Sequence, residues 1–300
     1  MTQIGFIGLG TMGGPMAANL VKGGHIVKGF DISFSSVETF VANGGVAADT
    51  SADAAESVEF VFTMLPNSEH VKSALFDESG ALSTMNKNTI YIDMSTIHPF
   101  ETDAIREKLD GHGIKMIDAP IGRTSEEAAN GKSLLMVGGN KTEIEATLPL
   151  FELMGDTIID CGGPGAGARM KIVNNYMTTV LNVLTAEGLT LARTVGLDQD
   201  ICIEVLKGTP AGRSHLSTTY PARVFKNDLT PAFMIDLADK DLGIALDLAS
   251  KVNAPSELGG AAKSTYLAAK EEGRGEQDWT AIFSSLQNRA GLSLPVEQEV

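Results

Sequence analysis

The sequence predicts a doubly wound α/β domain with a mostly parallel sheet, followed by an all-α domain that a long helix joins to it. In the first half, short apolar runs alternate with helical stretches across short glycine-rich connections. This is the pattern of a parallel sheet with helices on both faces. In the second half, strand-like runs disappear. A glycine-rich segment, 161–167, separates the two patterns, so we expect domains over 1–163 and 164–300.

The composition is that of a folded protein with an acidic surface. Of its 300 residues, 43% are hydrophobic and 20% are charged, which is too apolar for a disordered chain and suffices for two modest domains. The net charge of −15 repels phosphate backbones and anionic lipid, so we expect no nucleic acid and no membrane as partner. Two cysteines and five scattered histidines favour neither a disulfide framework nor a zinc site. We find no leader-like segment and no apolar stretch of membrane-spanning length, and we therefore expect a cytoplasmic location.

The elements of the first domain follow from its apolar runs and the segments between them. Strands that are covered on both faces consist of nearly continuous apolar residues. We expect strands at 4–7, 26–30, 60–64, 90–94, 115–118, 134–137 and 157–160. We expect helices between them at 12–22, 35–43, 71–76 and 99–110.

The second domain begins with a long helical segment. From 168 to about 195 the sequence has no proline and few other helix breakers, which predicts a helix of roughly 28 residues, about 40 Å long. Further helices are expected at 199–207, 234–252, 259–272 and 279–290, with breaks at Pro231 and Pro255. The tail from 293 is expected to be frayed.

A glycine motif connects the first expected strand to the first expected helix. Gly8, Gly10 and Gly13 form the pattern G-x-G-x-x-G between an apolar strand and an amphipathic helix. Gly8 suits a tight turn, Gly10 lets a pyrophosphate approach the backbone, and Gly13 lets the helix pack closely on the strand. This context predicts a dinucleotide site and a Rossmann domain, and the intervening Thr11 and Met12 belong to the same site. The alternative is a tight turn without a ligand.

Asp31 is expected to choose between the two nicotinamide cofactors. It ends the second apolar run, and none of the next three residues is an arginine. A carboxylate there accepts hydrogen bonds from ribose hydroxyls and repels a 2′-phosphate, so NAD (NADH) is favoured over NADP. The alternative is that Asp31 caps the following helix.

Two further loops are expected at the carboxyl ends of strands, where parallel sheets bind nucleotides. Leu65 and Pro66 follow one apolar run, and Ser95 and Thr96 follow another. We expect Ser95 to contact the substrate and the other three residues to contact the cofactor. Ser95 and Thr96 could also cap the helix that begins near Pro99, a role compatible with ligand binding.

A polar stripe near the start of the long helix predicts the catalytic group. Lys171, Asn174, Asn175 and Thr178 are spaced i, i+3, i+4 and i+7, which places them on one helix face. An ammonium can stabilise the alkoxide that develops on a carbonyl oxygen and donate a proton to it, while a nicotinamide provides the hydride. The asparagines would hold oxygen atoms of the substrate without adding charge. The alternative, a solvated face, fits poorly with the apolar residues that flank the stripe.

Together, these motifs resemble the β-hydroxyacid dehydrogenase family, which includes 3-hydroxyisobutyrate dehydrogenases. The similar segments follow in order along nearly the whole chain: GLGTMG at 8–13, DMSTIHP at 93–99, DAPIGRT at 118–124, GAGARMKIVNN at 165–175 and KDLGIALD at 240–247. The resemblance implies an NAD-binding Rossmann domain, a long connecting helix and an all-helical domain. It also implies that Lys171 is the catalytic lysine, that Lys240 lies near the nicotinamide, and that the chain forms a homodimer or homotetramer.

One segment departs from the family's pattern. Typical members carry Ser-Gly-Gly after the DAP segment to hold a substrate carboxylate, whereas this chain carries Gly122, Arg123 and Thr124, followed by Ser125. The variant resembles the branch of the family that acts on 3-sulfolactaldehyde, a small sulfonated aldehyde of sulfoquinovose degradation. A sulfonate is tetrahedral and always ionised, so an added guanidinium and hydroxyls suit it. The alternative for Arg123 is a salt bridge between domains.

Three functions follow from these expectations. The first is NADH-dependent reduction of 3-sulfolactaldehyde to 2,3-dihydroxypropane-1-sulfonate, with the proton from Lys171. Arg123 would bind the sulfonate, with Thr124, Ser125 and Asn174 in support and Gly122 beside them. The second keeps the reaction but takes a small hydroxy-carboxylate of the 3-hydroxyisobutyrate, tartronate semialdehyde or 4-hydroxybutyrate type. The third is a non-catalytic nucleotide-binding module, which the lysine and the net charge of −15 disfavour.

Overall fold

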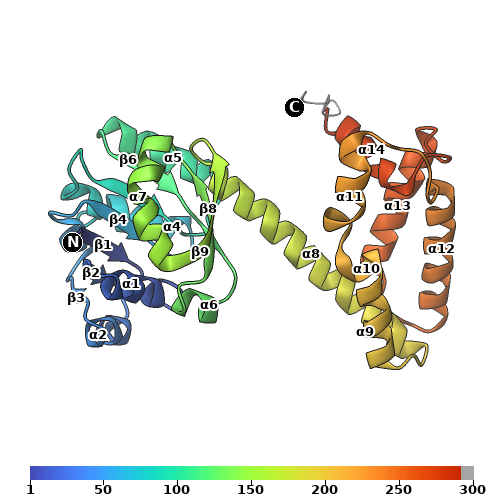
Figure 1. Ribbon diagram of the computed structural model, residues 1–300, viewed down its shortest axis with the longest axis horizontal. Coiled ribbons are helices and arrows are strands. Elements are labelled where there is room, and N and C mark those ends of the chain that lie inside the picture. Colours follow the sequence, from blue (N-terminus) through green and yellow to red (C-terminus); the bar gives the residue numbers. More distant parts are fainter. Residues whose placement is uncertain (292–300) are drawn as a thin grey trace. The chain divides into compact units, whose positions relative to one another are not determined.

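The computed structural model describes residues 1–291 and divides into two compact units, Met1–Met177 and the residues from Thr178 onward (Figure 1). The boundary lies within helix α8 (Ala166–Thr194), later in the chain than the expected division after 163. The first turn of α8 is hydrogen-bonded to the sheet, as described below, and this makes it part of the first unit. The tail from 293, expected to be frayed, lies outside the described residues.

The first unit is built on a nine-stranded sheet with the order β3-β2-β1-β4-β5-β6-β8-β7, in which β9 pairs with β8. All pairs are parallel except those of β8 with β6 and β7, so the mostly parallel, doubly wound sheet is confirmed. The strands are β1 (Gln3–Ile7), β2 (Ile26–Phe30), β3 (Val46–Ala47), β4 (Phe60–Thr63), β5 (Ile90–Asp93), β6 (Lys115–Asp118), β7 (Ile121–Gly122), β8 (Ser133–Gly138) and β9 (Gly155–Gly162). The sequence pattern does not predict the two-residue strands β3 and β7.

Helices flank this sheet at the positions that the alternating pattern indicates. They are α1 (Gly13–Lys22), α2 (Phe34–Ala42), α3 (Ser51–Ala55), α4 (Ser68–Phe76), α5 (Pro99–Gly111), α6 (Ser125–Ala129) and α7 (Lys141–Met154), with a 3₁₀ turn η1 at Ala81–Ser83. The four expected helices correspond to α1, α2, α4 and α5. The sequence pattern does not predict α3, α6 or α7, the last of which contains Pro149.

Two apolar cores lie on opposite faces of the sheet, because successive residues of a strand point to opposite faces. On one face Phe6, Phe62, Ile92 and Ile117 are neighbours across β1, β4, β5 and β6, and the rings of Phe6 and Phe62 stack at 5.7 Å. Helices α1 and α7 contribute to this core, whereas α3, α4 and α5 contribute to the other. Burial on both faces explains why the strands are nearly continuous apolar runs.

The regular elements in the described residues of the second unit are all helices, and an isolated bridge joins Met234 and Asp278. This confirms the all-helical expectation. After α8 come α9 (Gln199–Gly208), α10 (Pro210–Arg213), η2 (His215–Ser217), α11 (Thr219–Ala222), η3 (Val224–Lys226), α12 (Ile235–Lys251), α13 (Glu257–Glu271), η4 (Trp279–Ala281) and α14 (Ile282–Arg289). Pro231 and Pro255 lie between helices, as expected. None of the helices in residues 1–291 is both long and apolar enough to span a bilayer.

Candidate active site

A cavity of about 570 Å³ opens where β1, β2 and β4 end. Its lining brings together several residues that the sequence singles out, namely Gly8, Gly10, Asp31, Leu65 and Pro66. A cavity of about 380 Å³ shares Gly10 with it and is lined by Thr11. The glycine loop and the loop after β4 therefore meet at the edge of the sheet where the sequence predicts a nucleotide.

The glycine turn has a geometry that suits close approach of a phosphate. Gly8 has a φ of 98°, and a Cβ on it would lie 2.3 Å from the carbonyl oxygen of Met64. A Cβ on Gly13 would lie 2.0 Å from the carbonyl oxygen of Gly8, so α1 packs directly on the turn. A Cβ on Gly10 would meet no atom of the described chain within 4 Å. Glycine is required at Gly8 and Gly13, while Gly10 leaves its backbone open to a ligand.

Asp31 connects the glycine turn to the end of β2. Its carboxylate accepts hydrogen bonds from the N–H groups of Leu9 and Ser33, each at 2.7 Å. The side chain of Ser33 caps α2, so the alternative reading of Asp31, as the cap of this helix, is wrong. None of the described residues that line the 570 Å³ cavity is a lysine or arginine. Each carboxylate oxygen can accept a second hydrogen bond, so Asp31 retains acceptors for ribose hydroxyls.

Ser95 lies behind the loop that lines this cavity. It is 3% exposed, and its Oγ accepts a hydrogen bond from the N–H of Leu65 at 3.0 Å. Helix α5 is capped by His98, whose Nδ1 accepts from the N–H of Phe100 at 3.2 Å. The expectation that Ser95 or Thr96 caps this helix is therefore wrong. Thr96 is exposed, whereas Ser95 supports a neighbouring backbone.

Asp118 fixes the N-terminus of α8 to the sheet. It ends β6 and is 3% exposed, and its carboxylate oxygens accept hydrogen bonds from the N–H groups of Gly165 at 2.6 Å and Ala168 at 2.7 Å. The first turn of a helix leaves its N–H groups without helical partners, and a negative charge is favourable there. Burial raises the pKa of Asp118, and the two N–H bonds oppose that rise.

The same end of α8 approaches the sheet closely. A Cβ on Gly167 would lie 2.2 Å from the carbonyl oxygen of Met136, and a Cβ on Gly138 would lie 2.6 Å from the nitrogen of Gly167. Both contacts are with backbone atoms, so a larger residue would push the helix away from the sheet. The two glycines and Asp118 together set where α8 begins.

Lys171 follows this anchored turn and is half-buried. Burial lowers the pKa of its ammonium, and no carboxylate among residues 1–291 acts to raise it. Asn174 and Asn175 lie on the same helix face, and Nδ2 of Asn174 donates to Oδ1 of Asn175 at 3.2 Å. Thr178 lies further along the same helix. An ammonium with a lowered pKa gives up its proton more readily, which suits a general acid.

Arg123 forms its bonds within the first unit. Its guanidinium donates to Oδ1 of Asp156 at 2.5 Å, to Oγ1 of Thr157 at 2.9 Å and to the carbonyl oxygen of Lys132 at 2.5 Å. The sequence allowed a salt bridge between domains as the alternative for Arg123. Arg123 does form a salt bridge, with Asp156. Both residues lie in the first unit, so the expectation that this salt bridge joins the two domains is wrong.

The residues beside Arg123 begin a short helix. Gly122 ends β7, and Thr124 caps α6 by accepting from the N–H of Glu127. The Glu127 side chain in turn accepts from the N–H of Thr124, and Ser125 is the first residue of the helix. The hydroxyl of Thr124, expected to contact substrate, therefore has a structural partner.

Lys240 lies on α12 in the second unit. Its side chain is 60% exposed, and its Nζ lies 3.1 Å from Oδ1 of Asp241. The preceding Asp239 is buried and accepts from Lys263 and Lys270. Lys240 is thus accessible to a ligand, whereas Lys263 and Lys270 are engaged by Asp239.

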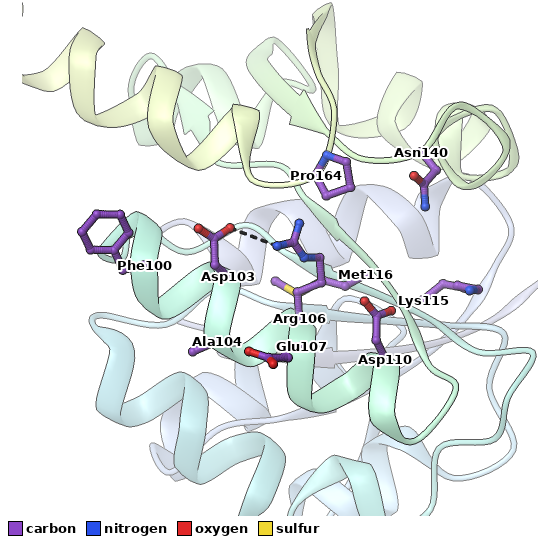
Figure 2. Close-up of a pocket in the computed structure, with 10 residues that line it drawn as sticks. All are labelled: Phe100, Asp103, Ala104, Arg106, Glu107, Asp110, Lys115, Met116, Asn140 and Pro164. Carbon is purple, nitrogen blue, oxygen red and sulfur yellow. Dashed lines mark hydrogen bonds and ion pairs between the residues drawn. The ribbon is translucent and has the colours of Figure 1, made fainter.

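A larger cavity of about 630 Å³ lies elsewhere on the first unit, along α5 and beside Pro164 (Figure 2). Its lining mixes charges of both signs, and Arg106 pairs with Asp103 across 3.3 Å. None of the described residues that line it belongs to the set that the sequence singles out. We therefore take the cavity at the glycine turn as the candidate nucleotide site. Its described lining does not include Lys171, Asn174 or Arg123, so their part in the reaction is taken up below as a proposal.

Comparison with known proteins decides the family. A model of the NAD binding domain of 6-phosphogluconate dehydrogenase matches residues 3–163, and the NAD-binding model of NADP-dependent 3-hydroxyisobutyrate dehydrogenase matches residues 165–286. The chain belongs to the 3-hydroxyisobutyrate dehydrogenase family. It is 44% identical to 3-sulfolactaldehyde reductase of Escherichia coli, over 99% of this chain and 100% of that protein.

Two further relatives support the same assignment. The chain is 35% identical to NAD-dependent L-serine dehydrogenase of Pseudomonas aeruginosa, over 94% of this chain and 97% of that protein. It matches the structure of 3-hydroxyisobutyrate dehydrogenase of Mycobacterium tuberculosis with a TM-score of 0.69 and 32% identity, over 96% of this chain and 99% of that one. The chain is thus an NAD-dependent oxidoreductase acting on CH–OH groups. The expected cofactor is confirmed, and the non-catalytic module is excluded.

Replacing Asp31 by asparagine should weaken NADH binding and reduce discrimination against NADPH. The amide keeps the size of the carboxylate but loses the charge that repels a 2′-phosphate. A lost hydrogen bond to a charged group corresponds to about a 10- to 150-fold change in affinity. We expect the ratio of kcat/KM for NADPH to that for NADH to rise by at least about tenfold. An unchanged ratio would contradict the assignment of Asp31.

Replacing Gly167 by alanine should destabilise the protein and reduce kcat. The added Cβ would overlap the carbonyl oxygen of Met136, so α8 and Lys171 must shift. Overpacking of this kind costs about 1–3 kcal/mol. Gly111→Ala is the matched control, because a Cβ at this last residue of α5 meets no described atom within 4 Å. Thermal unfolding and steady-state kinetics check this, and equal behaviour of the two variants would show that the close approach is unimportant.

Proposed function

We propose that the chain reduces 3-sulfolactaldehyde to 2,3-dihydroxypropane-1-sulfonate with NADH. The observation that carries the proposal is Arg123 in the segment Gly122–Thr124, where a fixed guanidinium replaces residues that suit a carboxylate. The 44% identity to a 3-sulfolactaldehyde reductase over 99% of the chain supports it. In this reaction the aldehyde carbon receives a hydride and its oxygen receives a proton, giving the alcohol and NAD⁺.

The cofactor is proposed to bind in the cavity at the glycine turn. Its pyrophosphate would lie against the backbone of Gly8 and Gly10, and its adenosine ribose against Asp31. Leu65, Pro66 and Thr96 would complete the contacts. When bound, NADH supplies the hydride. The cavity's acidic Asp31, and the lack of a lysine or arginine among its described lining residues, favour NADH over NADPH.

Lys171 is proposed to be the general acid. Its half-buried ammonium would donate a hydrogen bond to the aldehyde oxygen and pass a proton to it as negative charge develops. The lowered pKa of Lys171, caused by burial, favours that transfer. Asn174 and Asn175 would hold the substrate's hydroxyl and aldehyde oxygens, which keeps the carbonyl carbon oriented without a further charge.

Arg123 is proposed to bind the sulfonate, with Thr124 and Ser125 in support. The guanidinium already donates to Asp156 and Thr157, so a sulfonate must bind beside these two partners or displace one of them. The Arg123 and Asp156 side chains are 31% and 49% exposed, and exposed ion pairs contribute little to stability. Exchange of one anion for another at this guanidinium is therefore feasible.

The alternative substrate is a small hydroxy-carboxylate. One observation favours it: Asp156 already neutralises Arg123, and without exchange the guanidinium would not select a sulfonate. The backbone around Gly122 could then hold a carboxylate. Comparing catalytic efficiency on 3-sulfolactaldehyde and on its carboxylate analogue distinguishes the two substrates, and a preference for the carboxylate would overturn the proposal.

A second copy of the chain is the expected partner. Within α8 only Gly167 and Ala168 are buried, and Val173, Val183 and Leu184 are each at least half exposed. A long helix with uncovered apolar residues suits burial against another protomer. Sedimentation equilibrium should give a dimer or tetramer, and a monomer at all concentrations would contradict this.

Replacing Arg123 by glycine should raise the KM for 3-sulfolactaldehyde by about 10- to 150-fold, the effect of losing a charge-assisted hydrogen bond. Arg123 has a φ of 74°, a conformation that glycine adopts without strain, so the fold should tolerate the change. Asp156→Asn is the matched variant, because it frees the guanidinium, and it should lower the same KM. Equal loss on an uncharged aldehyde would show that Arg123 does not recognise the sulfonate.

Replacing Lys171 by methionine should lower kcat by about 10²–10³-fold, as removal of one preorganised donor typically does. Methionine keeps most of the apolar stem, so the change isolates the ammonium. The Kd for NADH, measured by fluorescence titration, should remain close to that of the wild type. A folded variant that binds NADH and retains most of its turnover would show that the proton has another source.

A further inference from the structure

A buried chain of hydrogen bonds lies behind the loop that lines the nucleotide cavity. Thr63 ends β4 and Asp93 ends β5, and the two are paired in the parallel register. The Oγ1 of Thr63 lies 2.6 Å from the hydroxyl of Tyr91 and donates to Oδ1 of Asp93 at 3.0 Å. Thr63, Tyr91 and Asp93 are at most 2% exposed. The proposed reaction assigns no role to these three side chains.

The series of hydrogen bonds continues from Asp93 to the loop that lines the cavity. Oδ1 of Asp93 accepts from the N–H of Ser95 at 2.9 Å, and Oγ of Ser95 accepts from the N–H of Leu65 at 3.0 Å. Met64 and Leu65 in turn contact the glycine turn, because a Cβ on Gly8 would lie 2.3 Å from the carbonyl oxygen of Met64 and 2.9 Å from Cδ2 of Leu65. Asp93 is thus connected to the cavity wall without lining it.

We infer that Asp93 is a positioning residue for cofactor binding, which holds Ser95 and thereby fixes residues 64–66 against the Gly8 turn at the spacing that NADH requires. The inference rests on the proposed placement of NADH in this cavity, and not on which aldehyde is reduced. Asp93 contacts neither cofactor nor substrate. Its effect is on the shape of the empty cavity, so it should be measurable in the binary complex with NADH.

The ionisation of Asp93 provides a second readout. Burial raises the pKa of Asp93 to about 6, while the hydroxyl and N–H of Ser95 and the hydroxyl of Thr63 oppose the rise, and Asp118 on the adjacent strand adds to it. Tyr91, on the same strand, stays protonated because burial raises its pKa. Above about pH 6 the carboxylate only accepts hydrogen bonds, which suits the three donors it faces. As the pH falls through about 6 it gains a proton and becomes a donor, and the alignment of Ser95 weakens.

The test is the Kd for NADH of Asp93→Asn, measured by fluorescence titration without aldehyde. At pH 8 we expect an increase of about tenfold. The difference from wild type should close as the pH falls through about 6, because the wild-type carboxyl then becomes neutral as well. Since the raised pKa means that the ionised carboxylate destabilises the folded state at pH 8, the amide should not lower the melting temperature there. If Asp93 had a purely structural role, Asp93→Asn would not bind NADH more weakly while its melting temperature stayed the same.

Two further variants sharpen the test. Ser95→Ala removes the next group in the chain and should raise the Kd similarly, and the double variant with Asp93→Asn should be no worse than either single one. Thr89→Val is the matched control: Thr89 is 1% exposed, directly precedes β5 and donates to the carbonyl oxygen of Val58 at 3.0 Å, at the other end of the strand. It should lower stability and leave the Kd unchanged.

Two results would overturn the inference. A Kd for Asp93→Asn within twofold of wild type at pH 8, with Asp31→Asn still weakening NADH binding, would remove the role of Asp93 while keeping the placement of NADH. If Asp31→Asn also leaves the Kd unchanged, then the placement and the inference both fail. Equal weakening by Thr89→Val would show that any loss of a buried bond in β5 has this effect, and the specific role of Asp93 would be wrong.

Discussion

The carboxylate of Asp118 is the contact on which the geometry of the active site depends. It joins the end of β6 to the N–H groups of Gly165 and Ala168, and Lys171 follows within one helical turn. A negative charge is favourable at a helix N-terminus, which offsets the cost of burying it. Because Gly167 permits contact between backbones, the helix start has little room to move relative to the sheet. The position of the lysine is therefore set by the sheet.

Two buried carboxylates on neighbouring strands each position a different part of the site. Asp93 and Asp118 are paired in the register of β5 and β6. Asp118 holds the helix that carries Lys171, whereas Asp93 faces the loop after β4 through Ser95. The loop proposed to contact the cofactor and the helix of the proposed proton donor thus depend on adjacent positions at the carboxyl edge of one parallel sheet. Such an edge collects the ends of strands that are far apart in the sequence.

The electrostatics of the chain explain why local cations matter. With a net charge of −15, the protein as a whole repels an anionic substrate, and only nearby positive groups can reverse this. Lys171 has no compensating carboxylate within the described chain. Arg123 is paired with the carboxylate of Asp156, which reduces the positive field around the guanidinium. The hydrogen bond from Arg123 in turn lowers the pKa of Asp156 and keeps it ionised. Competition between Asp156 and a substrate anion would then influence selectivity.

The sequence alone determined the parts of this protein that local patterns encode. Alternating apolar runs predict the parallel sheet, the glycine spacing predicts the turn at Gly8, and a proline-free segment predicts α8, because periodicity and backbone freedom are properties of neighbouring residues. The partners of Asp93, Asp118 and Arg123 were decided by the tertiary structure. Asp156 lies 33 residues from Arg123, and Ala168 lies 50 from Asp118. No local pattern marks such pairs, since strand pairing and helix packing bring them together only when the chain folds.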